Sequence, residues 1–61
     1  SIKQMEINRA KEYKKYMNTA FPDLKDDVAD LYQLMHDNIE EGNNEVEEVE
    51  NFLEACDDLV T

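Results

Sequence analysis

The chain has 61 residues and a net charge of −10, from 16 acidic and 6 basic side chains. A chain this short forms one small domain, predicted here to span residues 1–61, and its single cysteine excludes an internal disulfide. It has no apolar run of the roughly 18 residues that cross a membrane and no signal-peptide pattern, so we expect an intracellular, cytoplasmic protein.

The charge is unevenly distributed along the chain. Residues 1–18 carry five bases and two acids, a net of +3, whereas residues 19–61 carry one base and 14 acids, a net of −13. A surface this acidic repels phosphate backbones and acidic membranes. We therefore expect no direct binding to nucleic acid or membrane, and a basic protein as the partner.

The first predicted element is a helix over about residues 2–19. Glu6 and Arg9 interrupt its apolar face, so its first two turns are expected to be poorly buried. Pro22 ends it, because proline disfavours helical geometry at Phe21. The residues predicted to share the apolar face are Ile2, Met5, Ala10, Tyr13, Tyr16, Met17 and Ala20.

A second helix is predicted over about residues 23–41. Pro22 suits a first turn, and Asp23 with Asp26 is a plausible pair of capping residues. The predicted buried stripe follows helical spacing. It consists of Leu24, Val28, Leu31, Leu34, Met35 and Ile39.

A third helix is predicted over about residues 45–59. Its apolar residues repeat at alternating steps of three and four, as in a heptad pattern, but for only two repeats. They are Val46, Val49, Leu53, Cys56 and Val60, widened by Phe52 and Leu59. The fold class is therefore all-α, a small three-helix bundle, with a helical hairpin that forms a homodimer as the alternative.

The stretch between the second and third helices partly matches a calcium loop. Asp37, Gly42 and Glu48 fit the first, sixth and twelfth positions of that pattern. Ile39, however, offers no oxygen at the third position, and Glu41 is long for the fifth. Asp37, Glu41 and Glu48 are therefore only a weak metal candidate.

A turn explains more of these residues than a calcium loop does. Ile39 continues the apolar stripe of the second helix, and Gly42 then closes that helix in a left-handed conformation. Asn43 or Asn44 caps the third helix, and Asn44 with Glu47 has capping-box spacing.

No set of residues indicates catalysis or a cofactor. His36 is predicted on the polar side of the second helix as a solvated surface histidine, and Cys56 as a small core residue. Asp57 and Asp58 would raise the thiol pKa of Cys56, which disfavours a nucleophile. With no glycine-rich phosphate loop and no Ser/His/Asp set, we predict a protein that is not an enzyme.

The segment NRAKEYKKYMN mixes basic side chains with Tyr13 and Tyr16. Such a mixture can hold a nucleotide by stacking and ion pairing. Because both rings fall on the predicted apolar face, we favour a core face beside solvated or ion-paired lysines. Those lysines are Lys11, Lys14 and Lys15.

The acids work against local helix rules and therefore mark a candidate surface. A helix C-terminus favours bases, yet acids crowd the ends of the second and third helices. Along the third helix they are spaced about 6 Å apart by helical rise, comparable to phosphates along a DNA strand. The predicted partner-binding residues are Asp26, Asp30, Asp37, Glu40, Glu41, Glu47, Glu50, Glu54 and Asp58.

In size and charge only, the chain resembles the small acidic inhibitors that phages and mobile elements make against host nucleases, restriction systems or polymerases. The resemblance implies a viral-type inhibitor or modulator that binds a basic, nucleic-acid-binding protein, with mimicry of DNA as one way of doing so. Two alternatives stay open. One is a module that binds calcium or a small ligand, and the other is a structural protein that oligomerises through exposed Phe21, Tyr32 and Met35.

Overall fold

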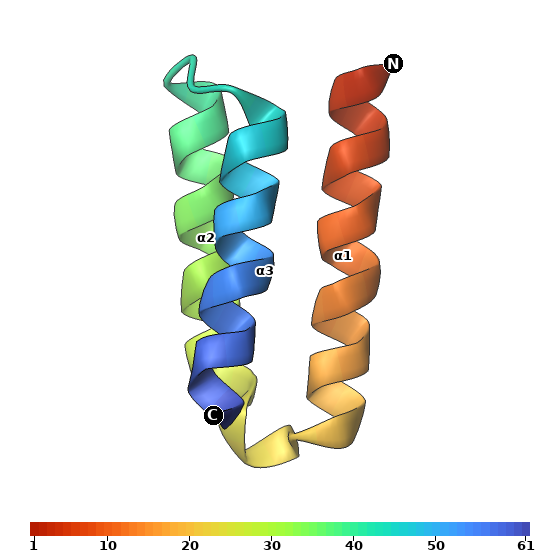
Figure 1. The fold of residues 1–61 in the computed structure, drawn as a ribbon, viewed down its shortest axis with the longest axis vertical. Coiled ribbons are helices and arrows are strands. Elements are labelled where there is room, and N and C mark those ends of the chain that lie inside the picture. Colours follow the sequence, from red (N-terminus) through yellow and green to blue (C-terminus); the bar gives the residue numbers. More distant parts are fainter.

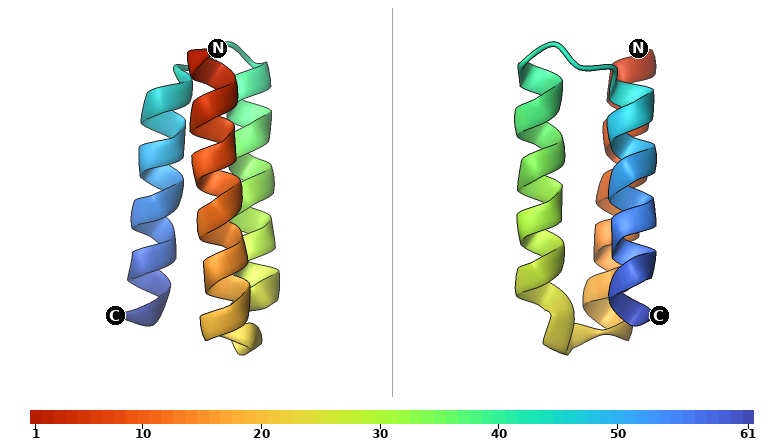
Figure 2. Two further views of the ribbon diagram at one scale, coloured as in Figure 1. Left: turned by 90° about the vertical axis from the view of Figure 1, so that its right-hand side faces the viewer. Right: turned by 60° about the vertical axis from the view of Figure 1, so that its left-hand side comes forward.

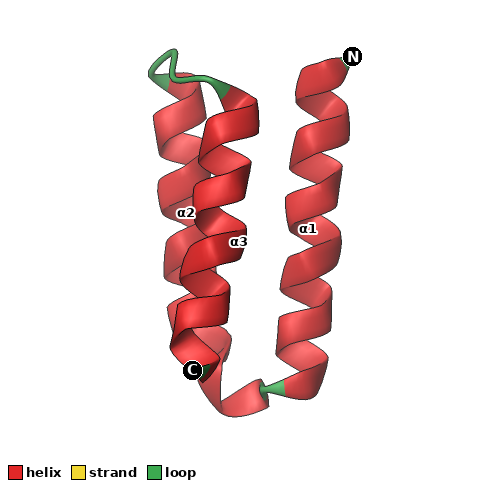
Figure 3. Ribbon diagram, in the orientation of Figure 1, coloured by secondary structure: helices red, strands yellow, loops and turns green.

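The computed structural model describes all 61 residues as three helices and no strand (Figures 1 and 3). Helix α1 spans Ile2–Ala20, α2 spans Lys25–Glu40 and α3 spans Glu45–Val60, with a single 3₁₀ turn, η1, at Pro22–Leu24. Neighbouring helices run antiparallel, so α1 and α3 run in the same direction (Figures 1 and 2). The all-α, three-helix prediction is confirmed.

The junction between α1 and α2 differs from the prediction. The backbone N–H of Phe21 donates to the carbonyl of Met17 at 2.8 Å, and Pro22 then starts η1. Leu24 is the residue before α2, and no side chain caps that helix. The predicted Asp23 and Asp26 cap is therefore wrong, because backbone carbonyls within the 3₁₀ turn accept from the first free N–H groups.

The junction between α2 and α3 follows the predicted turn. Gly42 has a φ of +100°, the left-handed region that closes a helix. The N–H of Asn43 donates to the carbonyl of Asn38 at 3.1 Å, and that of Gly42 donates to the carbonyl of Ile39 at 3.0 Å, which completes a Schellman motif. The Oδ1 of Asn44 then accepts from the N–H of Glu47 at 3.0 Å and caps α3.

The core is formed where the three helices meet. Its buried side chains are Ala10 and Met17 from α1, Val28, Met35 and Ile39 from α2, and Val49, Phe52 and Cys56 from α3. The rings of Tyr32 and Phe52 meet edge to face, 5.6 Å apart, and join α2 to α3. Since each helix contributes to one cluster, the bundle closes within a single chain.

The predicted face of α1 is partly wrong. Ile2, Met5, Tyr16 and Ala20 are exposed, whereas Ile7, which lies outside the predicted face, packs against the core. The buried stripe runs through positions 7, 10, 13 and 17 at steps of three and four, so it lies to one side of the predicted face. The expected poor burial of the first two turns is confirmed at Ile2 and Met5.

The predicted stripes of α2 and α3 were too wide. Leu34 in α2 is 56% exposed, and Leu59 in α3 is 37% exposed. Val46 and Val60 in α3 are exposed to about the same extent as Leu59. In a three-helix bundle the two neighbouring helices cover only a narrow strip along the surface of each helix. Leu34 lies about 100° around the axis of α2 from the buried Met35, outside that strip. The structure therefore leaves apolar side chains beside its core.

Candidate interaction surface

Every residue of the predicted partner-binding set is exposed. On α2 and its end these are Asp26, Asp30, Asp37, Glu40 and Glu41, and on α3 they are Glu47, Glu50, Glu54 and Asp58. Both helices lack basic residues in their last turns, as the sequence indicated. The acids at those ends thus face the partial negative charge of the helix carbonyls without a compensating base.

Few of these acids have a basic neighbour. The chain has three ion pairs, and only the pair between Arg9 and Glu50 involves an acid of residues 19–61. Lys25, the one base in that region, makes no ion pair. Asp37 accepts a hydrogen bond from Gln33 Nε2 at 3.0 Å, which leaves its charge unneutralised. Of the 14 acids in that region, 13 therefore present charge that no base in the chain pairs.

Two polar contacts tie α1 to α3. The guanidinium of Arg9 bonds both Glu6 and Glu50, and the phenol of Tyr13 donates to Asp57. The bond to Asp57, with partial burial, raises the pKa of Tyr13 to about 12. Glu50 is thus shared between the acidic row and the α1–α3 contact, so its carboxylate is less free to meet another molecule than those of Glu47, Glu54 and Asp58.

The basic and aromatic segment of α1 is arranged differently from the predicted apolar face. Tyr13 is partly buried, but Tyr16 is exposed, so only one of the two rings lies on the core side. The Nζ of Lys14 lies 5.0 Å from the centroid of the Tyr32 ring, a cation–π distance. Lys15 pairs with Glu12 at 3.7 Å. These two lysines are engaged with neighbouring side chains rather than gathered around an open aromatic platform.

His36 and Cys56 have different outcomes. His36 lies outside the core but is only partly exposed, because its ring packs edge to face against Tyr32 with the centroids 4.6 Å apart, so the predicted solvated surface histidine is confirmed only in part. Cys56 is fully buried, which confirms it as a core residue. Burial first, and the charge of Asp57 second, raise the pKa of the Cys56 thiol to about 11.

The weak calcium candidate does not form a loop. Asp37 and Ile39 lie within α2, and Glu41 follows its last residue, so the first half of the pattern is helical. Glu48 instead accepts a hydrogen bond from Asn38 Nδ2 at 2.9 Å. No group of three or more His, Cys, Asp or Glu side chains is placed to hold a metal ion.

The predicted oligomerisation residues are also differently placed. Met35 is only 2% exposed, and Phe21 and Tyr32 pack in part against the core. These three side chains therefore do not form an exposed apolar face. The prediction failed because helical spacing shows which residues share a face but does not show how wide a strip the neighbouring helices cover.

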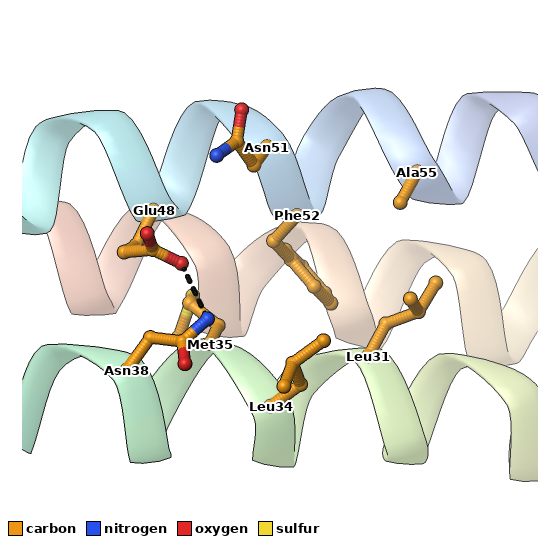
Figure 4. A pocket seen from close by; sticks show the side chains of 8 residues that line it. All are labelled: Leu31, Leu34, Met35, Asn38, Glu48, Asn51, Phe52 and Ala55. Atoms are coloured by element: carbon orange, nitrogen blue, oxygen red, sulfur yellow. Dashed lines mark hydrogen bonds between the residues drawn. The ribbon is translucent and has the colours of Figure 1, made fainter.

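A groove between α2 and α3 was missed by sequence reasoning (Figure 4). It has a volume of about 250 Å³, and Leu31, Leu34, Phe52 and Ala55 line its apolar part. The bonded pair of Asn38 and Glu48 lies at one end.

A second hollow continues the first along the helices, and the two together form the α2–α3 groove. The second hollow has a volume of about 370 Å³, shares Leu31 and Leu34, and adds Leu59 and the acids Asp27 and Asp30. The sequence carried part of the signal for these hollows, the apolar residues themselves, but not which of them the packing would leave exposed. Leu34 and Leu59 widen their stripes beyond the line that a three-helix bundle buries.

Comparison with protein-family models, with curated proteins and with solved structures finds no match to this chain. None of its helices combines the length and the apolar character that crossing a bilayer requires.

Proposed function

We propose that this protein is a non-enzymatic interaction module that binds a basic, nucleic-acid-binding protein through the acidic faces of α2 and α3. By occupying the surface that the partner uses for nucleic acid, it would inhibit or modulate that partner. The observation that carries the proposal is the unpaired charge. Of the 14 acids in residues 19–61, only Glu50 has a basic partner within the chain.

The spacing of these acids supports their acting together. Glu47, Glu54 and Asp58 are exposed along α3, and acids four residues apart are separated by about 6 Å of helical rise. This is shorter than the Debye length of about 8 Å at physiological ionic strength, so their fields overlap. Such a field attracts a basic surface from a distance and accelerates its association.

The acids at the helix ends also lower the stability of the fold, which supports a role for them outside folding. Each acid at a helix C-terminus destabilises by about 0.3–1 kcal/mol, and a small domain is stable by only about 5 kcal/mol in total. The bases that could offset this charge are concentrated in α1, where Lys15 pairs with Glu12 and Lys14 lies over Tyr32. A basic partner would relieve the repulsion on binding.

The test uses purified basic nucleic-acid-binding proteins, chosen from nucleases, restriction enzymes and polymerases, with labelled duplex DNA as a competitor. For a true partner we expect the chain and the DNA to displace each other, and the affinity to fall steeply as salt rises. Single reversals Glu47→Lys, Glu54→Lys and Asp58→Lys should each weaken binding.

Glu12→Lys is the matched control, because it makes the same charge change on α1, away from the acidic faces. If it weakens binding as much as the α3 reversals do, only net charge matters and the proposed surface is wrong. Simultaneous binding of DNA and the chain to the partner would contradict competition for the nucleic-acid site.

A further inference from the structure

The α2–α3 groove joins an apolar floor to acidic margins. Leu34 is 56% exposed and Leu59 is 37% exposed, and both lie beside hollows that the fold leaves open. Asp27 and Asp30 flank the hollow that contains Leu59. Glu48 lies at the other end of the groove and carries a single hydrogen bond, from Asn38. The groove therefore selects for two properties at once, an apolar strip and positive charge.

We propose that the α2–α3 groove receives one amphipathic helix of the partner, with an apolar stripe on Leu31, Leu34 and Leu59 and with lysines or arginines beside Asp27, Asp30 and Glu48. This inference rests on the proposed function, because it says which part of a basic partner enters the acidic surface. The bound helix would become the fourth helix of a bundle.

The shape of the groove favours a helix over other occupants. It lies between the antiparallel helices α2 and α3 (Figure 2), and its lining runs along α2 from Asp27 to Asn38, about 16 Å by helical rise. A helix placed there packs its own ridges against both neighbours, as in helix-in-groove recognition. Ala55, the smallest side chain of the lining, lies at the end of the first hollow opposite Asn38 and Glu48 and leaves room there for a larger side chain of the incoming helix (Figure 4).

The charge of the groove selects against a second copy of this chain. Two copies that met through it would bring the acidic margins of one groove, Asp27, Asp30 and Glu48, against those of the other, with a net charge of −10 on each chain. The only base-rich helix of the chain, α1, is already packed in the core through Ala10 and Met17. A basic helix from another protein meets neither obstacle.

The test uses two synthetic peptides of about 16 residues, a length that matches α2. The first places leucines at helical spacing and lysines on their flanks, and the second has the same composition in a scrambled order. We expect the amphipathic peptide to bind at physiological salt and to shift the amide signals of Leu31, Leu34 and Leu59 in ¹⁵N NMR spectra. The scrambled peptide should bind at least about tenfold more weakly, because its leucines cannot reach the groove together.

Leu34→Gln and Leu59→Gln should each lower the affinity for the amphipathic peptide about tenfold. The helix content of the protein should stay unchanged, since both side chains are partly exposed. Met5→Gln and Val46→Gln, exposed apolar residues outside the groove, are the matched controls and should leave the affinity unchanged. Equal loss in both sets would overturn the groove as the site.

Three other results would also overturn the inference. They are equal affinity for the two peptides, binding of neither peptide, and a mass of twice 7.2 kDa that Leu34→Gln returns to the monomer. The proposed function is judged separately by the DNA competition of the whole partner protein. If that competition depends on Glu47, Glu54 and Asp58 but not on Leu34 or Leu59, the acidic faces act without the groove.

Discussion

The α2–α3 hairpin and helix α1 take their places in the bundle through different kinds of contact. The hairpin is defined by its own short-range signals, the left-handed Gly42 and the capping Asn44. Helix α1 is positioned by contacts across more than 40 residues of sequence, which join Arg9 to Glu50 and Tyr13 to Asp57. The comparison indicates that the acidic hairpin is the locally determined unit, and that α1 supplies the missing core side chains and positive charge.

The largest expected loss of stability comes from truncating a side chain in the core that α1 and the hairpin share. Phe52→Ala removes a ring that is 2% exposed and packs edge to face on Tyr32. It should cost about 3–5 kcal/mol, comparable to the whole stability of about 5 kcal/mol expected for a domain of this size. Circular dichroism during urea titration should show no cooperative transition.

Phe52→Leu is the control, because it keeps most of the apolar volume. It should retain a cooperative transition at a lower midpoint. If Phe52→Ala instead unfolds cooperatively with a loss below about 1 kcal/mol, the ring is not the centre of the packing.

The turn of the hairpin is the next place to test. Gly42→Ala puts a β-carbon on a residue with φ of +100°, although no atom lies within 4 Å of that position. The change should therefore cost about 1–2 kcal/mol through backbone conformation alone. Urea denaturation measures the loss. Gly42→Asn should cost less, since asparagine adopts the left-handed region more readily, and equal losses would argue against the backbone explanation.

The cap of α3 should have a smaller effect. Asn44→Ala removes the side-chain acceptor for the N–H of Glu47 and should cost about 1 kcal/mol. Thermal unfolding followed at 222 nm checks this, and Asn44→Ser, which keeps an acceptor oxygen, should restore most of the loss. No difference between alanine and serine would show that the hydrogen bond contributes nothing measurable.

The hairpin turn could be predicted from the sequence because its signals are local. Gly42 and Asn44 have a conformation and a hydrogen bond that follow from residue type and spacing. The end of α1 at Pro22 could be predicted for the same reason, but the cap of α2 could not, because the 3₁₀ turn supplies backbone acceptors that no side-chain pattern shows.

The contacts between helices could not be predicted. Helical spacing placed Leu34 and Met35 in one stripe, but only the positions of the neighbouring helices decide that Met35 is buried and Leu34 exposed. For the candidate surface, exposure of the acids was predictable from their type, whereas the groove beside them depends on how α2 and α3 pack. The role of those acids in binding is still a prediction.

The smallest expected effect lies in the long-range contacts of α1. In the folded chain the pKa of Tyr13 is raised from 10.0 to about 12, mainly by its hydrogen bond to Asp57 and then by burial. A raised pKa means that folding favours the protonated phenol, so this stabilisation is complete below pH 10 and is lost as the pH rises through about 12. Tyr13→Phe should cost less than about 1 kcal/mol at neutral pH, because the bond is near the surface.

The measurement is the free energy of unfolding in urea at a series of pH values from neutral to 12, with the tyrosinate absorbance at 295 nm recorded in parallel. The original chain should lose stability across the alkaline range, partly through Cys56, whose thiol pKa is also raised. Tyr13→Phe should lose less over pH 10–12, whereas Tyr16→Phe, an exposed tyrosine with no hydrogen bond to an acid, should behave like the original chain. If Tyr13→Phe and Tyr16→Phe show the same alkaline slope, the bond to Asp57 does not hold α1 against α3.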